Sequence, residues 1–573
     1  MNKEDGRRRE CDVLVLGSGA AGLATAVTAA KHGLNVSILE KENVFGGTTA
    51  FSGGVLWIPG NALAYARGIV DERDSARAYL RHEIGNFYDV DSVEAYLENG
   101  PKMLDFFESE TEVQFLPTDY PDYHPDAPGG VDIGRSVVAA PYDIRKLGTE
   151  VARLRRPLEA ITFMGMMFNS TNRELRHFFN VTKSARSAAY VAKRLGQHII
   201  ALLRYGRGVE VTGGNALVAR LVRTALNEGV PIITGARTRE LIVEEGRVTG
   251  ARVDVDGSEV TFSARLGVVL ACGGFSHAAA KTRSAFPHLS QGGEHLSLTP
   301  ESNTGDGIGF AESAGARFQS RLSQAAAWMP ASSIPGHGPY PHIVDRYKPG
   351  VIAVNNKGLR FTNEANSYHD FCSAMLRECG PRPEAWLICD HRTIRKYGLG
   401  FVKPAPVPLG HHLRSGYLKK APSISKLAEW IGVDVDALEA TIGRYNNDAR
   451  RGEDSVFGRG RTSFNRFLGD REHQPNPNVA PVEAPPYYAI RVVMGDIGTF
   501  DGIATDTVGR VLGSNDTPIG GLFAVGNDRR SIMGGNYPGA GITLGPAMTF
   551  GYVTALHLAS QSDLDARSED LAS

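Results

Sequence analysis

The chain has 573 residues, which at about 100 to 200 residues per domain corresponds to two to four structural units. Its 62 lysines and arginines face 63 aspartates and glutamates, so the net charge of −1 argues against a nucleic-acid-binding protein. The 66 glycines outnumber the 30 prolines, an excess that is typical of chains whose backbone approaches a ligand closely.

The composition also bears on the compartment. The five cysteines include no C-x-x-C pair, which argues against a disulfide framework and against a zinc or iron–sulfur site. Residues 1–10 contain no apolar signal segment, and no stretch approaches the roughly 18 apolar residues of a membrane-spanning helix. We therefore expect a cytoplasmic protein without a metal site.

A dinucleotide-binding pattern lies close to the N-terminus. Residues 12–16 form an apolar run of strand length, a Gly-x-Gly-x-x-Gly loop spans 17–22, and residues 23–32 have helical spacing. A second apolar run at 36–39 ends at Glu40, which is placed to accept hydrogen bonds from a ribose. In such a βαβ unit the second glycine admits a pyrophosphate to the helix N-terminus.

Three later segments favour FAD over NAD. Residues 46–54 form a glycine and hydroxyl cluster that a nicotinamide site does not need. Apolar runs end at glycines 273–274, after a hairpin-like stretch at 239–255, and again at 526–527, and a helix follows 541 to about residue 560. The predicted cofactor-binding residues are Gly17, Ser18, Gly19, Ala20, Ala21, Gly22, Glu40, Lys41, Gly46, Gly47, Thr48, Thr49, Ser52, Gly53, Gly54, Ala271, Gly273, Gly274, Asp306, Gly526, Asn527, Gly541, Thr543 and Leu544.

These segments are distant in sequence but belong to one nucleotide-binding fold, so the sequence between them must be inserted. We predict an α/β fold: a Rossmann-like FAD-binding domain built from discontinuous segments, with an inserted α+β catalytic domain. The expected boundaries are 10–300 and 487–573 for the FAD-binding domain and 301–486 for the catalytic domain. The polar tail 561–573 is expected to fray.

Residues 151–207 form a basic segment, in which eleven lysines and arginines face two glutamates and alternate with apolar side chains. We expect a helical insertion. Basic charge beside exposed apolar groups suits peripheral contact with an anionic membrane at its inner face. The alternative is that the segment packs on the protein body or on a partner subunit.

Four segments carry a resemblance to a known family. They are the 17–22 loop, the 46–54 cluster, Arg360-Phe361-Thr362-Asn363-Glu364 and, above all, the loop 537–541 that leads into the helix through 551. Together they resemble the 3-ketosteroid Δ1-dehydrogenases, which are relatives of the fumarate reductase flavoprotein superfamily. The resemblance covers most of the chain and implies a bacterial FAD enzyme of steroid degradation that passes electrons to an external acceptor such as a quinone.

The resemblance also implies the reaction and the residues that perform it. A base removes the C2 proton of the steroid A ring, hydride leaves C1 for flavin N5, and two donors stabilise the developing enolate on the C3 ketone. Because a free tyrosine has a pKa near 10, a tyrosine base needs neighbours that stabilise its phenolate. The implied catalytic residues are Tyr368 as base, Tyr123 as its support, and Tyr537 and the N–H of Gly541 as ketone donors; the implied pocket residues are Ser52, Tyr120, Tyr537 and Pro538.

Other functions remain as alternatives. They are a 3-ketosteroid Δ4-(5α)-dehydrogenase, a fumarate reductase-like enzyme and a flavin-binding redox protein without turnover. A fumarate reductase-like enzyme would need arginines to clamp a dicarboxylate. Members of the superfamily can attach FAD through a histidine, but no histidine lies between Gly33 and Arg81, so we expect non-covalent FAD.

Overall fold

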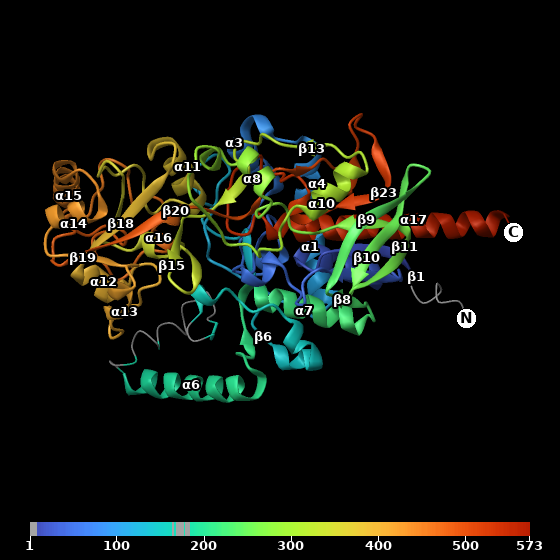
Figure 1. Cartoon of the computed structure of the whole chain (residues 1–573), viewed down its shortest axis with the longest axis horizontal. Helices are drawn as coiled ribbons and strands as arrows, with labels where there is room; N and C mark the ends of the chain where they lie inside the picture. Colours follow the sequence, from blue (N-terminus) through green and yellow to red (C-terminus); the bar gives the residue numbers. More distant parts are fainter. Residues whose placement is uncertain (1–7, 163–164, 168–176, 178–180, 182–183, 573) are drawn as a thin grey trace.

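The computed structural model describes residues 8–162, 165–167, 177, 181 and 184–572, and its strands form two eight-stranded sheets and three smaller ones. The two large sheets lie side by side along the long axis of the molecule (Figure 1). The strands of the second sheet come from the chain between those of the first.

The first sheet is centred on β1 (Arg8–Leu16), which pairs in parallel with β2 (Val36–Glu40) and β11 (Ser258–Leu270). The predicted strands at 12–16 and 36–39 and the hairpin at 239–255 are confirmed, because β9 and β10 pair antiparallel across that stretch. Val13 and Val15 of β1 are fully buried, as expected of a strand with helices on its face. The other strands are β8 (Ile232–Thr234), β9 (Ala236–Glu244), β10 (Arg247–Val255), β22 (Arg510–Leu512) and β23 (Pro518–Ala524).

Helices with small side chains pack on this sheet. In α1 (Ala20–Lys31) small residues leave room for the C-terminal helix α17, where a Cβ on Gly551 would lie 2.8 Å from the carbonyl oxygen of Ala21. Helix α17 runs through Leu544–Ala572 and so includes most of the polar tail 561–573. The other helices of this half are α2 (Ala62–Tyr65), α3 (Arg73–Ile84), α4 (Val90–Glu110), α7 (Gly213–Asn227), α8 (Ala279–Ala285), α9 (Pro287–Ser290) and α10 (Asp306–Ser313).

The second sheet is organised around β20 (Tyr487–Thr499), which pairs with β18 over seven residues from Glu384↔Val493 to Asp390↔Tyr487. It also pairs with β12 (His295–Ser297). The expected boundaries at 300 and 486 are therefore wrong, because long-range pairing places both strands in the second sheet. The remaining strands are β14 (Ala326–Trp328), β15 (Ala331–Ile334), β16 (Gly338–Pro341), β17 (Val351–Asn355), β18 (Glu384–Asp390) and β19 (Lys419–Ala421).

Short elements complete both halves. The helices near the second sheet are α11 (Tyr368–Glu378), α12 (His391–Tyr397), α13 (Gly410–Arg414), α14 (Ile424–Ile431), α15 (Val435–Ala449) and α16 (Ser463–Phe467). The small sheets contain β3 (Val55–Trp57), β4 (Phe115–Pro117), β5 (Ser136–Ala139), β6 (Tyr142–Asp143), β7 (Glu210–Val211), β13 (Phe318–Gln319) and β21 (Gly502–Ile503). The 3-10 turns are η2 (Thr48–Phe51), η3 (Gly85–Phe87), η4 (Ile144–Arg153), η5 (Glu159–Ile161), η6 (Asp345–Tyr347) and η7 (Gly526–Asp528).

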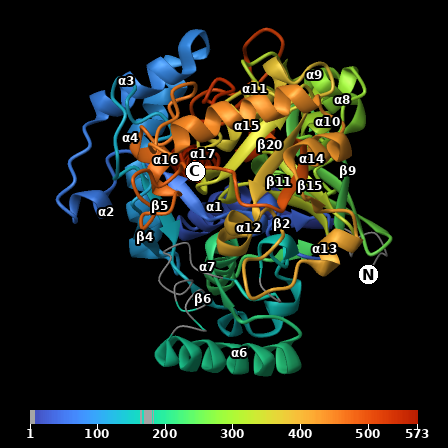
Figure 2. The ribbon, with the colours of Figure 1, turned by 90° about the vertical axis from the view of Figure 1, so that its left-hand side faces the viewer.

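The basic segment contains one long helix, α6 (Ala185–Tyr205), at the periphery of the molecule (Figures 1 and 2). It buries Ser187, Val191, His198 and Ala201. Part of the segment, 163–164, 168–176, 178–180 and 182–183, lies outside the described residues. Among the residues that the structure describes, no helix combines the length and apolar character that crossing a bilayer requires.

Candidate active site

A cavity of about 560 Å³ opens where strands of the first sheet end, and residues of both halves line it. From the first half come the loops after β1, β2, β11 and β23; from the second come the segments 340–347 and 464–468. The carboxyl ends of parallel strands meet at one sheet edge, which is the usual place for a nucleotide in such folds.

The three glycines of the 17–22 loop have different structural roles. Gly17 has φ +112°, and a Cβ there would lie 2.1 Å from the carbonyl oxygen of Ala271. A Cβ on Gly22 would lie 2.1 Å from the carbonyl oxygen of Gly17, so both positions are fixed by packing within the protein. Gly19 lines the cavity, and its Cβ would meet only Thr49 Oγ1 at 3.7 Å. Gly19 therefore leaves the room that a pyrophosphate would need.

Glu40 is buried beside this loop and also lines the cavity. Its Oε2 accepts hydrogen bonds from the backbone N–H of Ser18 at 3.2 Å and from Ser18 Oγ at 2.5 Å. Its Oε1 accepts from the N–H of Glu42 at 3.0 Å. The carboxylate thus holds the loop in shape and keeps lone pairs for a ribose hydroxyl.

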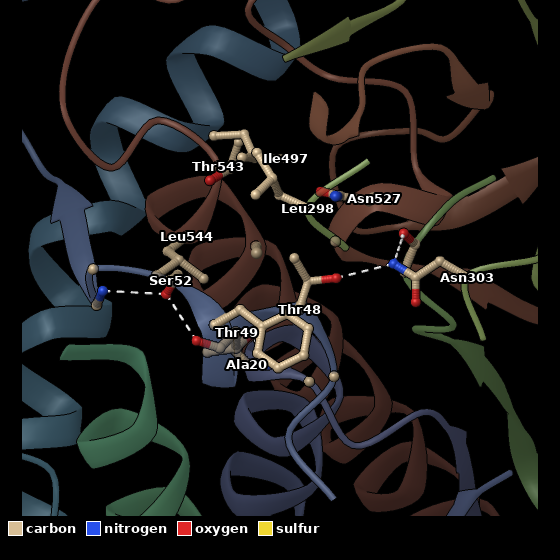
Figure 3. Close-up of a pocket in the computed structure, with 18 of the residues that line it drawn as sticks. Ala20, Thr48, Thr49, Ser52, Leu298, Asn303, Ile497, Asn527, Thr543 and Leu544 are labelled. Carbon is tan, nitrogen blue, oxygen red and sulfur yellow. Dashed lines mark hydrogen bonds between the residues drawn. The ribbon is translucent and has the colours of Figure 1, made fainter. Parts of the chain in front are cut away.

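The hydroxyl cluster of η2 faces the same space (Figure 3). Thr49 Oγ1 accepts the N–H of Ala20 at 3.0 Å, at the first turn of α1. Thr48 Oγ1 accepts from Asn303 Nδ2 at 2.9 Å, which joins the cluster to a segment 255 residues away in sequence. Ser52 Oγ donates to the carbonyl oxygen of Thr49 at 2.8 Å and accepts the N–H of Gly54 at 3.1 Å.

Two further sets of contacts join distant segments at the cavity. Lys41 Nζ and Asp306 Oδ2 form an ion pair at 2.7 Å. Asp528 is fully buried and accepts the N–H groups of Cys272 at 2.6 Å and Gly274 at 2.9 Å; burial raises the pKa of its carboxyl to about 6. Asp528 therefore ties the loops after β11 and β23, which both contribute to the cavity.

Most of the predicted cofactor residues line this cavity, and their chemistry fits FAD. The open position at Gly19, the first-turn N–H groups of α1 and the buried acid Glu40 form a cradle for a pyrophosphate and a ribose. The predicted residues at the cavity are Gly17, Ser18, Gly19, Ala20, Ala21, Glu40, Lys41, Gly47, Thr48, Thr49, Ser52, Gly53, Gly54, Ala271, Gly273, Asp306, Gly526, Asn527, Gly541, Thr543 and Leu544.

Four predicted residues do not line the cavity. Gly22 packs α1 against its own loop, Gly46 donates its N–H to Ser18 Oγ at 3.1 Å, and Gly274 is held by Asp528. Pro538, expected in the substrate pocket, instead has its carbonyl oxygen engaged by the N–H of Tyr123 at 2.9 Å and by Tyr79 Oη at 2.6 Å. These contacts hold the loops that surround the cavity, and the predicted roles of the four residues stay predictions.

Three predicted tyrosines from separate segments meet in the cavity. Tyr123 lies in the loop after β4, Tyr368 begins α11, and Tyr537 precedes α17; all three are buried. The hydroxyls of Tyr123 and Tyr368 are 3.2 Å apart. The ring of Tyr537 lies 5.6 Å from that of Tyr123 and 5.0 Å from that of Tyr368, measured between centroids. Tyr120 lines the same cavity and packs on Phe467 at 4.6 Å.

Charged groups fix the loop of Tyr123 against α11. His124 Nδ1 lies 2.7 Å from Glu83 Oε2, and His124 Nε2 lies 3.1 Å from Asp370 Oδ2. Burial opposes the charge on His124, but hydrogen bonds with Asp370 and Glu83 raise the pKa of its imidazole to about 11. The imidazolium therefore links the residue after Tyr123 to the first turn of the helix that carries Tyr368.

The surroundings of the tyrosines set their acidity. Burial raises the pKa values of Tyr368 and Tyr123 well above the usual range, and burial also raises that of Tyr537. A phenolate at Tyr368 consequently requires a hydrogen-bond donor, and the hydroxyl of Tyr123 donates to the Tyr368 oxygen at 3.2 Å. Within the described part of the chain, the N–H of Gly541 donates no hydrogen bond, so it is available to an oxygen in the cavity.

Several cavity residues could not be predicted from sequence patterns. Asn303 follows no motif and is recognised only through its hydrogen bond to Thr48. Met329, Tyr347 and Phe464 are apolar or aromatic wall residues of the kind that fill any core. Lys403 lies in a proline-rich stretch without helical or strand periodicity.

Arginines are absent from the described residues that line this cavity. Arg529 is buried outside it, with its guanidinium 3.4 Å from the ring centroid of Phe550. Arg360 is engaged by two carboxylates, Glu364 at 2.7 Å and Asp454 at 2.9 Å. Neither arginine therefore lines the cavity.

Comparison with known proteins identifies the family. The family model for FAD binding domains matches residues 12–544. The chain belongs to the FAD binding domain family. A 4-oxocyclohex-2-ene-1-carboxylate 5-dehydrogenase of Sinomonas cyclohexanicum is 41% identical over 552 residues, which covers 95% of this chain and 92% of the relative. A 3-oxosteroid 1-dehydrogenase of Mycobacterium tuberculosis is 37% identical over 575 residues, with 97% and 99% coverage.

A solved structure agrees over nearly the whole chain. The 3-ketosteroid Δ1-dehydrogenase from Sterolibacterium denitrificans, crystallised with 1,4-androstadiene-3,17-dione, matches with a TM-score of 0.87 at 36% identity. The match covers 96% of this chain and 100% of the other. This member of the FAD binding domain family is accordingly an FAD-dependent oxidoreductase.

Proposed function

We propose that this flavoprotein is a 3-ketosteroid Δ1-dehydrogenase, which introduces a C1–C2 double bond into the steroid A ring. The observation that carries the proposal is the meeting of Tyr123, Tyr368 and Tyr537 in one cavity with the FAD cradle. The 3-oxosteroid 1-dehydrogenases among its relatives support the same reaction. Residues 295–499, which form the second sheet, act as the catalytic domain in this proposal.

Each residue of the cluster has a distinct task. The hydroxyl of Tyr537 and the free N–H of Gly541 hold the ketone oxygen and stabilise the enolate, each by an amount on the order of 3 kcal/mol. Tyr368 takes the C2 proton, and Tyr123 donates a hydrogen bond to the Tyr368 oxygen when it is a phenolate. Non-covalently bound FAD supplies the acceptor for the hydride from C1, and an external acceptor of the quinone type reoxidises it.

The alternatives fit less well. A dicarboxylate reductase needs cations that clamp two carboxylates, but the described cavity residues include no arginine. A redox protein without turnover has no use for three buried tyrosines that converge on one space. A Δ4-(5α)-dehydrogenase shares fold and cofactor, and only the position of the new double bond separates it from this proposal.

A second candidate substrate class is a small ring ketone that carries a carboxylate. The relative with 41% identity acts, by its name, on 4-oxocyclohex-2-ene-1-carboxylate. The observation in this chain that favours such a substrate is Lys403, a cation that lines the cavity. The chemistry at the ketone would be unchanged, since an enolate must form in either ring.

The test is Tyr368→Phe in the FAD-loaded protein. Removing the hydroxyl should keep steroid binding but slow flavin reduction by at least about 10²-fold, the lower end for general base catalysis. Stopped-flow absorbance measures the reduction. Unchanged kinetics would assign the proton to another group. Denaturation should also release free FAD, and flavin that stays attached to a peptide would contradict a non-covalent site.

We further propose that α6 makes peripheral contact with an anionic membrane. Ile199, Ile200 and Leu203 are 52%, 65% and 85% exposed, and Lys193 and Arg204 are exposed on the same helix. The helix lies along one side of the molecule (Figure 2). Wild-type protein should sediment with phosphatidylserine vesicles, and Leu203→Glu should reduce the sedimented fraction several-fold. Protein that stays in the supernatant, or forms dimers that Leu203→Glu disrupts, would contradict the membrane contact.

A further inference from the structure

The cavity contains a cation whose role the proposed reaction does not explain. Lys403 is partly buried at its wall, and its Nζ lies 5.4 Å from the ring centroid of Phe401. Burial lowers the pKa of its ammonium group. Among the described residues, no carboxylate lies within ion-pair distance of Lys403. An ammonium that loses water on burial without gaining a counter-charge is unfavourable.

Two histidines pack on the same phenylalanine ring that Lys403 contacts. The ring of Phe401 lies 5.5 Å from His337 and 5.8 Å from His412, measured between centroids. Burial, together with the charges of His411, Lys403 and His337, lowers the pKa of His412. Two carboxylates lie in this region. Glu159 Oε1 is 3.7 Å from His337 Nδ1, with its side chain 73% exposed, and the buried Asp345 pairs with His342 at 2.7 Å and accepts the N–H of Gly400 at 2.9 Å. Both carboxylates are paired with histidines, and among the described residues neither forms an ion pair with Lys403.

The other charged residues that line the cavity are already paired or used. Lys41 forms its ion pair with Asp306, and Glu40 accepts hydrogen bonds from Ser18 and Glu42. The wall of the cavity also contains apolar and aromatic residues, among them Tyr340, Ile343 and Tyr347. Such a wall accommodates a hydrocarbon skeleton, and a cation within it discriminates in favour of a substrate that brings an anion.

We infer that Lys403 binds a carboxylate carried by the ketone substrate, so that this enzyme prefers keto acids over neutral ketones of the same skeleton. The inference rests on the proposed dehydrogenation and specifies its substrate class. Lys403 takes no part in the bond-breaking steps. Its ammonium group donates hydrogen bonds to the substrate carboxylate and so compensates for the water that the carboxylate loses on binding.

The experiment compares acids with their own methyl esters. The substrates are 3-oxoandrost-4-ene-17β-carboxylate and 4-oxocyclohexanecarboxylate, each compared with its methyl ester. The proteins are the wild type, Lys403→Met, Lys403→Arg and the control Lys420→Met, which changes an exposed lysine of β19. The readouts are kcat/KM, flavin content, and ligand affinity from quenching of flavin fluorescence, which needs no turnover.

Lys403→Met should lower kcat/KM and affinity for the acid by about tenfold to a hundredfold, as expected for a hydrogen bond to a charged group. The same two quantities for the ester should change by less than about twofold. Lys403→Arg should restore most of the preference, and Lys420→Met should resemble the wild type. Equal effects on acid and ester, or no effect, would overturn the inference. Loss of flavin from Lys403→Met would also overturn it, because the lysine would then hold a cofactor phosphate. If the wild type binds the acids in a Lys403-dependent way but oxidises none of the four compounds, the proposed function fails while the anion site stands.

Discussion

Tyr123→Phe gives a quantitative test of how the buried base is made to work. The hydroxyl of Tyr123 lies 3.2 Å from that of Tyr368, and burial raises the pKa of Tyr368 well above the usual range. A hydrogen bond to a charged acceptor contributes roughly 1.5 to 3 kcal/mol. Since 1.36 kcal/mol corresponds to one pKa unit, loss of this donor should raise the apparent pKa of Tyr368 by about one to two units.

The consequence is a rate effect that depends on pH. Where Tyr368 is protonated in both proteins, the variant should reduce its flavin about 10 to 150 times more slowly, which follows from the same energy. As pH rises through the wild-type pKa and then through that of the variant, the two rates should converge. Anaerobic stopped-flow flavin reduction by a 3-ketosteroid, measured across pH, gives both curves.

Tyr120→Phe is the matched control, because Tyr120 lines the cavity but packs on Phe467 instead of reaching Tyr368. It should leave the pH profile unchanged. A constant loss of rate at every pH in Tyr123→Phe would mean that Tyr123 acts through packing alone. If the pH dependence of flavin reduction in Tyr123→Phe matches that of the wild type, the role of Tyr123 as a hydrogen-bond donor to Tyr368 is refuted.

Three further predictions follow from single contacts. Gly19→Val should fold but lose FAD, because its side chain has room within the protein and occupies the cavity. Gly22→Val should fail to fold, because its Cβ would lie 2.1 Å from a backbone oxygen. Circular dichroism and flavin absorbance distinguish the two outcomes, and a Gly19→Val protein with full flavin content would refute the proposed pyrophosphate cradle. Tyr537→Phe should weaken 3-ketosteroid oxidation by roughly 10²-fold or more through loss of one ketone donor, and intact kcat/KM would contradict this. His124→Gln should lower the melting temperature most below about pH 6.5, and this loss should shrink as pH rises toward about 11. The reason is that a pKa that is higher in the folded than in the unfolded state means that the protonated imidazole stabilises the folded protein. A loss that grows with pH would contradict the assignment.

The sequence predicted the parts of the site that are local in the chain. The βαβ unit through Glu40 could be read because its strands, turn glycines and helix follow one another directly. The meeting of Tyr123, Tyr368 and Tyr537 came from resemblance to a family, since no spacing rule connects residues that are more than 160 positions apart.

The errors have a common physical cause. The boundary at 486 is wrong because β20, which begins at Tyr487, pairs with β18 of the second sheet. Local sequence patterns do not reveal such long-range pairing. The family resemblance implies that Pro538 lies in the pocket, whereas its carbonyl oxygen accepts hydrogen bonds from Tyr79 and from the N–H of Tyr123. Asn303 and Lys403 reach the cavity from loops whose course only tertiary packing determines.

The central claim is tested most directly by anaerobic titration of the FAD-loaded protein with a 3-ketosteroid that has a saturated A ring and with its Δ4 analogue. Flavin absorbance reports reduction, and NMR of the extracted product locates the new double bond. The proposed function predicts that both compounds bleach the flavin stoichiometrically and that the new double bond joins C1 and C2. A flavin that stays oxidised, or a product with its new double bond between C4 and C5, would contradict it.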